Sequence, residues 1–403
     1  MRNRTGFSLT ALALFAPAAF AGGGTDDLGK VQIPALKAID VSYKPGKGIT
    51  FDGGDEFSLT IYNRLQVQYA FLVLDNNVAD VSTFAVRRGR TKFKGHVFDK
   101  KTNYMMNVEW STGGNNILDF WVSHEAWSND EWGVNVRAGA GKTQYGIEAT
   151  GSSNNLEFVE RSLATSTFAN TRATGALAMA RGMENKLRIH AGVFNTDTAG
   201  GSPAAAQNGI NADNELNYTG GVRYDLHKDG GEAESYAQGD LERRQDWDAT
   251  LAGNIWLGNE RAGGQDIDVF AYTVGGAFKG WGIHGLAEFF SYSADPDVGA
   301  KTDAMGWNIQ GSYALEQGWG FGGRASMVTI DDNASFLTAR TGTPITLGAV
   351  SGDVTEFTFG VNKFWNNHAR KIQGDVTFQE VNPDGGTPSS SNILFRVMFT
   401  LAI

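Results

Sequence analysis

The residues of this sequence that most clearly suggest chemistry are five basic side chains at alternate positions. They are Arg88, Arg90, Lys92, Lys94 and His96. Alternate residues of an extended strand point to the same side and stand about 7 Å apart, so these five would form one column of positive charge. Neighbouring like charges in such a column repel by roughly 2 kcal/mol at an effective dielectric near 20, so facing carboxylates or passing anions must offset them. An arginine fork matches two oxygens of a phosphate, which suits the column to anions of that kind.

Other charged residues extend or oppose this column. Three further arginines fall on the polar side of expected strands, and these are Arg64, Arg137 and Arg396. Arg87 has the opposite parity, so we expect it on the outer face, at a membrane interface or a subunit contact. In the alternative interpretation, acids such as Glu109 or Glu356 pair with the basic residues, which then only stiffen the fold.

Strands must position these residues, because apolar and polar residues alternate along the chain. From residue 57 to residue 71 the odd positions are apolar except for Asn63, and the even positions are mostly polar. A period of two indicates a strand with one apolar and one polar face. We expect about sixteen such strands, at residues 57–71, 83–97, 103–111, 117–128, 132–145, 173–183, 186–195, 215–228, 233–244, 266–279, 281–293, 302–315, 318–330, 353–365, 370–381 and 391–402.

The connections between these strands alternate in length. Short turns are expected near Lys100, Asp130, Asn185, Gly230, Gly280, Gln317 and Asn367. Longer connections are expected at 72–82, 146–172, 196–214, 245–265, 331–352 and 382–390, and 112–116 is a short exception. Aromatic residues flank the turns, namely Phe98, Tyr104, Trp127, Trp132, Trp281, Trp319 and Trp365. Long external loops, short periplasmic turns and aromatic girdles predict an all-β fold, a transmembrane antiparallel β-barrel of about sixteen strands. The basic column must then face the lumen, because each Arg or Lys facing lipid near the midplane would cost about 2–4 kcal/mol.

The N-terminus has the features of an export signal. Arg2 and Arg4 precede a short apolar run, and Ala19-Phe20-Ala21 fits a cleavage site. We expect residues 1–21 to be a signal peptide, residues 22–56 a periplasmic lead-in, and residues 57–403 the barrel. The predicted location is the outer membrane of a Gram-negative bacterium.

Composition and motifs argue against other classes of function. The net charge of −10 disfavours nucleic-acid binding, and the chain has no cysteine. The six histidines show no pair at metal-ligand spacing, and no Gly-x-Ser-x-Gly is present. The stretch from Gly139 to Thr143 lacks the earlier glycine of a phosphate-binding loop. His227 and His368 have no evident partner for catalysis. We therefore expect no enzyme activity, no cofactor and no metal site.

Several short motifs between residues 43 and 200 carry a resemblance to a known family. They include Arg87-Arg88-Gly89-Arg90, Lys142-Thr143-Gln144-Tyr145-Gly146 and Phe158-Val159-Glu160-Arg161-Ser162. These resemble motifs of the phosphate-selective porin O and P family, although Gly141 and Gln144 replace an expected aromatic residue and proline. The resemblance implies a sixteen-stranded barrel, a homotrimer, and passive uptake of anions such as phosphate or polyphosphate.

The 146–172 connection would be the third external loop. In general porins and in this family that loop folds inward and narrows the pore, so the resemblance implies a constriction here; the alternative is a purely external loop. Its candidate charged residues are Glu157, Glu160, Arg161 and Arg172.

Together these expectations describe an outer-membrane porin. It would form a water-filled channel for small anions, with inorganic phosphate and outer-membrane lipid as partners. The alternatives are a general diffusion porin, and a barrel enzyme or plugged structural barrel.

Overall fold

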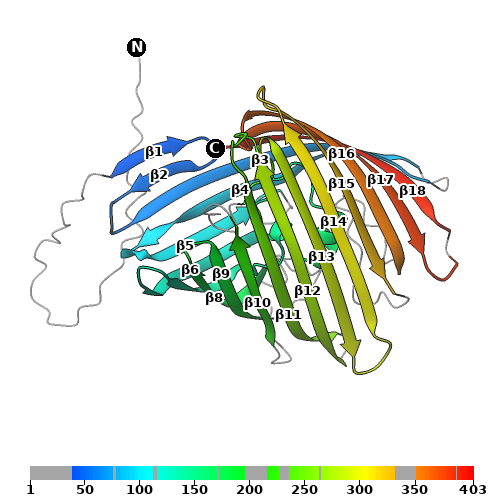
Figure 1. Cartoon of the computed structure of the whole chain (residues 1–403), viewed down its shortest axis with the longest axis horizontal. Coiled ribbons are helices and arrows are strands. Elements are labelled where there is room, and N and C mark those ends of the chain that lie inside the picture. The colour runs from blue at the N-terminus through cyan, green and yellow to red at the C-terminus, as the bar shows by residue number, and fades with distance from the viewer. Residues whose placement is uncertain are drawn as a thin grey trace, which may run out of the picture. The chain divides into compact units, whose positions relative to one another are not determined.

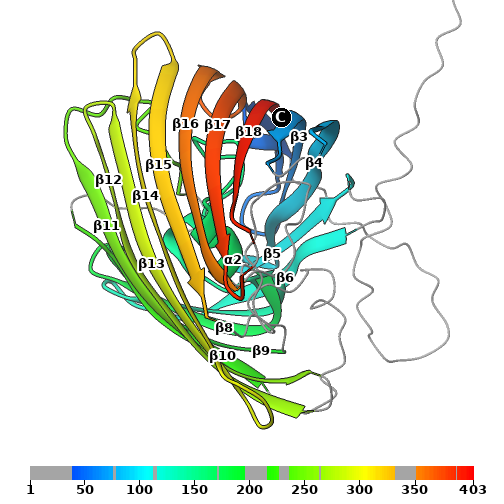
Figure 2. The same cartoon turned by 90° about the vertical axis from the view of Figure 1, so that its right-hand side faces the viewer.

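A closed antiparallel barrel of sixteen strands, β3 to β18, forms the body of the protein. The computed structural model describes residues 39–75, 79–111, 116–169, 172–195, 216–226, 236–262, 265–331, 351–386 and 388–403. Each strand pairs with the next one in chain order, and β18 pairs with β3 to close the ring (Figures 1 and 2). The predicted fold is confirmed. Within the described residues no helix is long and apolar enough to cross a membrane.

Most of the predicted strands lie close to their expected positions. The barrel strands are β3 (Ser58–Val73), β4 (Val81–Val97), β5 (Asp99–Glu109), β6 (Asn116–Ser128), β7 (Gly133–Lys142), β8 (Arg172–Gly182), β9 (Leu187–Asn195), β10 (Leu216–Asp225), β11 (Asp248–Ala262), β12 (Gln265–Gly280), β13 (Ile283–Pro296), β14 (Thr302–Ala314), β15 (Trp319–Ile330), β16 (Gly352–Asn366), β17 (Arg370–Pro383) and β18 (Ser390–Ala402). Ahead of them, β1 (Asp40–Lys44) and β2 (Gly48–Asp52) form a hairpin whose second strand pairs with the start of β3. The connection between β7 and β8 carries two short helices, α1 (Ile147–Thr150) and α2 (Leu163–Phe168).

Apolar side chains cover the outside of the barrel and polar ones its inside. On β18, Phe395 is 45% exposed whereas its neighbour Arg396 is 3% exposed. On β3, Leu65 is likewise exposed and Gln66 is fully buried. This is the reverse of a soluble protein and is the arrangement typical of a membrane β-barrel, whose outer face is apolar and whose inner face is polar. Exposed aromatic residues stand next to the short turns, as at Phe98, Trp127, Trp281, Trp319 and Trp365.

One predicted strand is wrong. The described part of the 233–244 segment, from residue 236 on, contains no strand, and β11 runs instead from Asp248 to Ala262, where the sequence predicted a long loop. Gly253 on the outer face and Trp256 on the inner face weaken the alternation of β11, which explains the error. We call the end of the barrel with the expected short turns the turn end, and the opposite end the loop end. At the turn end, a long connection joins β10 to β11 in place of the short turn predicted near Gly230. At the loop end, only two residues separate β11 from β12.

A β-bulge in β4 changes the direction of Arg87. Gln66 pairs with Arg88 and Val67 pairs with Val86, so Arg87 is an extra residue between two paired ones. A bulge of this kind re-aims the side chains beside it. The prediction that Arg87 points outward is therefore wrong. Its guanidinium group points into the barrel, where Nε lies 2.7 Å from Oε1 of Glu160, a residue of the inward-folded connection.

Candidate functional site

The connection between β7 and β8 folds into the barrel, and the inner wall holds its backbone. Glu288 of β13 accepts hydrogen bonds from the backbone N–H groups of Ile147 at 2.5 Å and Glu148 at 3.1 Å. On β17, Asp375 accepts one from the N–H of Val159 at 3.0 Å. Figure 2 shows α2 within the ring of strands. We call residues 143–169 the constriction loop, because they cross the lumen and lie along β12 to β17.

Aromatic side chains of the constriction loop pack where the wall has glycine. The ring of Phe168 stacks on Phe290, with 5.8 Å between the ring centroids. Gly306 of β14 lies beside it, and a Cβ atom there would come within 2.5 Å of the Phe168 ring. The ring of Phe158 lies 4.6 Å from the guanidinium carbon of Arg324. These contacts hold the loop against the wall. A larger residue in place of Gly306 would overpack the Phe168 ring, at a cost of typically about 1–3 kcal/mol.

Glu160 joins the constriction loop to β4, and Arg161 makes hydrogen bonds within the loop. Arg88 Nη2 lies 2.6 Å from Glu160 Oε2, and Arg87 contacts the other carboxylate oxygen. Burial raises the pKa of Glu160, but these two guanidinium groups outweigh burial and lower the pKa to about 2. Arg161 donates hydrogen bonds to the carbonyl oxygens of Glu148 and Gly151, at 3.2 and 2.8 Å. Both residues therefore carry charges that are already bonded within the protein.

The loop-end half of the basic column is bonded in the same way. Arg90 Nε lies 2.5 Å from Oε2 of Glu109, which is the pairing foreseen in the alternative interpretation. Glu356, the other acid named there, accepts from Gln379 instead, at 2.8 Å. Arg64 is buried beside the column and donates to Ser153 Oγ of the constriction loop at 3.1 Å. The contact between this part of the barrel wall and the constriction loop is thus formed by Arg64, Arg88 and Arg90.

The turn-end half of the column is more open. The Lys92 nitrogen lies 5.7 Å from the centre of the Tyr62 ring, and His96 Nδ1 lies 2.8 Å from Ser58 Oγ. Lys94 is exposed, and its ammonium group has no hydrogen-bond or ion-pair partner among the described residues. It lines a cavity on the turn-end side of the constriction loop, and this cavity is our candidate functional site.

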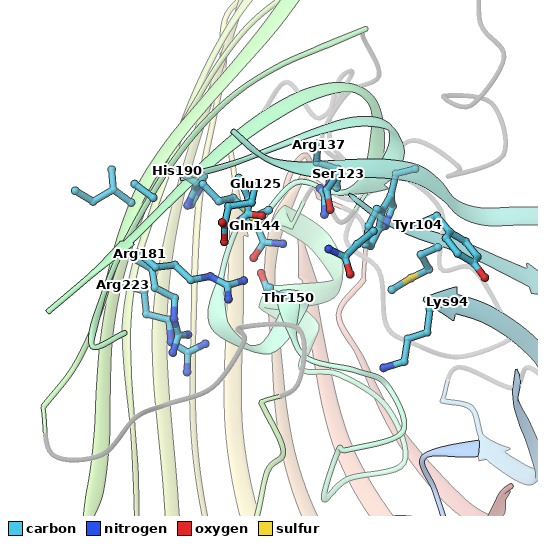
Figure 3. Close-up of a pocket in the computed structure, with 18 of the residues that line it drawn as sticks. Lys94, Tyr104, Ser123, Glu125, Arg137, Gln144, Thr150, Arg181, His190 and Arg223 are labelled. Atoms are coloured by element: carbon cyan, nitrogen blue, oxygen red, sulfur yellow. The ribbon is translucent and has the colours of Figure 1, made fainter. Parts of the chain in front are cut away.

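The basic cavity, as we call it, has a volume of about 550 Å³ and lies against β3 to β11. Its roof includes Gln144, Gly146, Ile147 and Thr150 of the constriction loop. Seven lysines and arginines line it, namely Lys94, Lys100, Lys101, Arg137, Arg181, Arg188 and Arg223. Among the described residues the only acid in its lining is Glu125. Figure 3 shows Arg181 and Arg223 reaching in from one side and Lys94 from the other.

Neighbouring groups orient the cations of the basic cavity without cancelling them all. Arg137 lies over the Trp121 ring, 5.6 Å from its centre, and donates to the carbonyl oxygen of Lys142. Arg188 and Arg223 share the buried carboxylate of Asp225, at 2.8 and 3.5 Å. One carboxylate between two guanidinium groups leaves a net positive charge on this wall.

The sequence predicted part of this site. Lys94 and Arg137 were predicted to face the lumen, and the barrel brings both to the same cavity. The prediction missed Arg181, Arg188 and Arg223, although Arg188 shares one face of β9 with His190 and that parity could have pointed to it.

Two residues predicted for the constriction loop make separate contacts. Arg172 is the first residue of β8 and pairs with Asp119, with 2.9 Å between Nε and Oδ1. Glu157 Oε2 lies 2.6 Å from His284 Nδ1, and Glu157 also accepts from Ser312. Burial raises the pKa of Glu157, but His284 outweighs burial and lowers it. Within the part of the chain that the structure describes, no three His, Asp or Glu residues lie close enough to bind a metal ion.

The strands and loop that build this site match a known protein family. Residues 59–235 fit the family model described as phosphate-selective porin O and P. The match covers 177 of the 403 residues of the chain and marks that part as similar to this family. This porin is therefore a protein of the Gram-negative outer membrane, and both family and fold indicate a channel rather than an enzyme. No curated protein sequence gives a significant match.

Solved structures share the fold of this porin at low sequence identity. The anion-selective porin from Comamonas acidovorans is 13% identical with a TM-score of 0.58, and the match covers 86% of this chain and 100% of that one. The outer-membrane channel DcaP of Acinetobacter baumannii is 10% identical with a TM-score of 0.57, covering 86% and 98%. OmpT of Vibrio cholerae in its trimer form is 10% identical with a TM-score of 0.51, covering 86% and 100%. At such identities the likeness establishes the barrel fold.

Proposed function

We propose that this porin is a water-filled channel for the passive diffusion of small anions, phosphate among them. The observation that carries the proposal is the charge of the basic cavity, whose lining has seven cations and one acid among the described residues. Basic side chains along a pore wall favour anions over cations. The structural neighbour from Comamonas acidovorans is an anion-selective porin, which agrees with this proposal.

The proposed route follows the wall formed by β3 to β11. The constriction loop packs along β12 to β17 and is also bonded to β3 and β4 through Ser153 and Glu160, and the basic cavity is the space beneath it. An anion would therefore meet Lys94 on one side and Arg181 and Arg223 on the other, as Figure 3 shows for these side chains. Of the predicted column, Lys94 belongs to this route directly, whereas Arg88 and Arg90 serve to hold the constriction loop.

Phosphate suits this lining for a chemical reason. A guanidinium group offers paired N–H donors that match two phosphate oxygens, and three arginines line the cavity besides Arg137. A chloride ion gains charge attraction but no paired hydrogen bonds. Phosphate should accordingly stay longer in the cavity than chloride and reduce the chloride current.

The same proposal includes export and assembly. We propose that residues 1–21 are a cleaved signal peptide; they lie outside the described residues. We also propose a homotrimer in outer-membrane lipid, in line with the trimer form of OmpT from Vibrio cholerae.

A general diffusion porin is the second candidate. It is favoured by the pairing of Arg88 with Glu160 and of Arg90 with Glu109, which removes part of the positive charge from the lumen. The two candidates differ in a measurable way, since a general porin would show weak ion preference and no block by phosphate.

Planar-bilayer recording tests the proposal. In a KCl gradient we expect a reversal potential that indicates anion preference, and a smaller chloride current after phosphate is added. The triple variant Lys94→Gln, Arg181→Gln and Arg223→Gln should lose both properties.

A matched triple variant controls for the change in total charge. Lys44→Gln, Lys47→Gln and Lys301→Gln remove three exposed cations that do not line the basic cavity. This variant should behave like the wild type. Cation preference in the wild type, or equal behaviour of the two triple variants, would contradict the proposed function.

A further inference from the structure

A second segment of the chain enters the barrel, from the end opposite to the constriction loop. We call residues 236–247, which precede β11, the inner segment. Tyr236 Oη lies 2.9 Å from His284 Nε2, on the inner face of β13. The Gly282 N–H donates to Asp240 at 2.7 Å, and the Lys279 ammonium group donates to a backbone carbonyl of the segment. These partners place the inner segment within the lumen, at its turn end.

Gln238 joins the inner segment to the constriction loop through both its backbone and its side chain. Its N–H donates to the Asn155 carbonyl at 2.8 Å, and its Oε1 accepts from the Glu157 N–H at 2.9 Å. Its Nε2 donates to Glu148 at 3.2 Å. On the other side, His368 Nε2 lies 2.8 Å from the Gln238 carbonyl oxygen. Gln238 is only 2% exposed, so all these bonds form away from water, where losing a partner is costly.

The inner segment also borders the basic cavity. The Tyr236 ring lies 5.4 Å from the guanidinium carbon of Arg223, which is a lining residue, and 4.5 Å from the Lys279 nitrogen. The ring therefore stands between the cavity and the inward-facing side chains of β12 and β13. From Tyr236 to Gln238 the segment forms a continuous link between the cavity edge and the constriction loop.

We propose that the inner segment determines the selectivity of the channel by closing the side of the lumen that faces β12 to β17. This inference rests on the proposed function. The constriction loop enters from one end and the inner segment from the other, and they meet at Gln238. A permeating ion is thereby confined to the basic cavity, where it passes close to the cations. Close passage strengthens their effect, because charge interactions weaken with distance and with the amount of intervening water.

Two variants test the inference. The first replaces residues 237–246 with two glycines, and the second is Gln238→Ala, which keeps the chain length. The control is Gln245→Ala, which changes an exposed glutamine of the same segment. Conductance scales with the open cross-section, so removing the barrier on one side should raise single-channel conductance about twofold. The anion-to-cation permeability ratio should move toward one, in the deletion more than in Gln238→Ala.

The outcomes separate this inference from the proposed function. Folded variants with the conductance and permeability ratio of the wild type would overturn the inference and leave the anion channel intact. A wild-type channel without anion preference would overturn the proposed function, while a rise in conductance in the deletion would still support the inner segment as a barrier. If the deletion fails to fold, Gln238→Ala against Gln245→Ala decides the question.

Discussion

Glu160 offers the sharpest test of how charge is balanced in the lumen. Its carboxylate pairs with Arg87 at 2.7 Å and with Arg88 at 2.6 Å, and these ion pairs tie the constriction loop to β4. The substitution Glu160→Gln keeps the size of the side chain and removes its charge. The guanidinium groups of Arg87 and Arg88 then lose their counter-charge at the contact between the loop and the wall.

The pKa of Glu160 sets the size of the effect on stability. A fall from the ordinary value of 4.5 to about 2 corresponds to about 3 kcal/mol of preference for the charged form. The effect on permeation is smaller, because ions pass through water. At about 7 Å and a dielectric constant near 80, one charge contributes about 0.6 kcal/mol to each ion, with opposite signs for an anion and a cation. Their permeability ratio therefore changes by about 1.2 kcal/mol, or roughly sevenfold.

We therefore expect Glu160→Gln to raise the anion-to-cation permeability ratio about sevenfold and to increase current noise as the loop loosens. The assay is the reversal potential in a KCl gradient across a planar bilayer. Glu184→Gln is the matched control, because it changes total charge equally at a turn where the glutamate side chain is 88% exposed. An unchanged or lower ratio in Glu160→Gln would refute the reasoning.

The same ion pairs predict how the channel responds to acid. Because the folded-state pKa of Glu160 is depressed, its stabilising contribution is fully present above pH 4.5 and is lost as the pH falls through about 2. The wild type should thus keep a steady current noise from pH 7 to pH 5 and approach the behaviour of Glu160→Gln only near pH 2. A transition near pH 6 would show that another group controls the loop.

Three further predictions concern the wall. Phe395→Arg places a charge on the lipid face and should lower the free energy of unfolding by about 2–4 kcal/mol, measured by urea titration in lipid vesicles; an unchanged value would mean that this face is not in lipid. Gly306→Leu should push Phe168 off the wall and raise current noise without loss of sheet by circular dichroism, and a quiet channel would contradict the packing of the loop there. Asp375→Asn should cost about 3–5 kcal/mol in the same urea titration, because it leaves the buried Arg396 without its carboxylate partner, and a cost under 1 kcal/mol would contradict that pairing.

Sequence alone determined the barrel and the direction of most of its side chains. Along β3 and β18, alternate residues face the outside and the lumen of the barrel. The polarity that each position requires is therefore visible in the residue type at that position, without knowledge of distant segments. Fifteen of the sixteen strands could be found in this way, and with them Arg64, Lys94 and Arg137 on the lumen side.

Only the tertiary structure decided what these lumen residues do. Glu160 lies 72 residues from Arg88 in the sequence, and Gln238 lies 81 residues from Glu157, so nothing in the local pattern indicates these contacts. The bulge that turns Arg87 inward also departs from the alternating pattern. The inner segment was mispredicted as a strand for a local reason, because the alternation of β11 is weak. Alternation reports which solvent a residue meets, whereas charge pairing depends on which segments the closed barrel brings face to face across its interior.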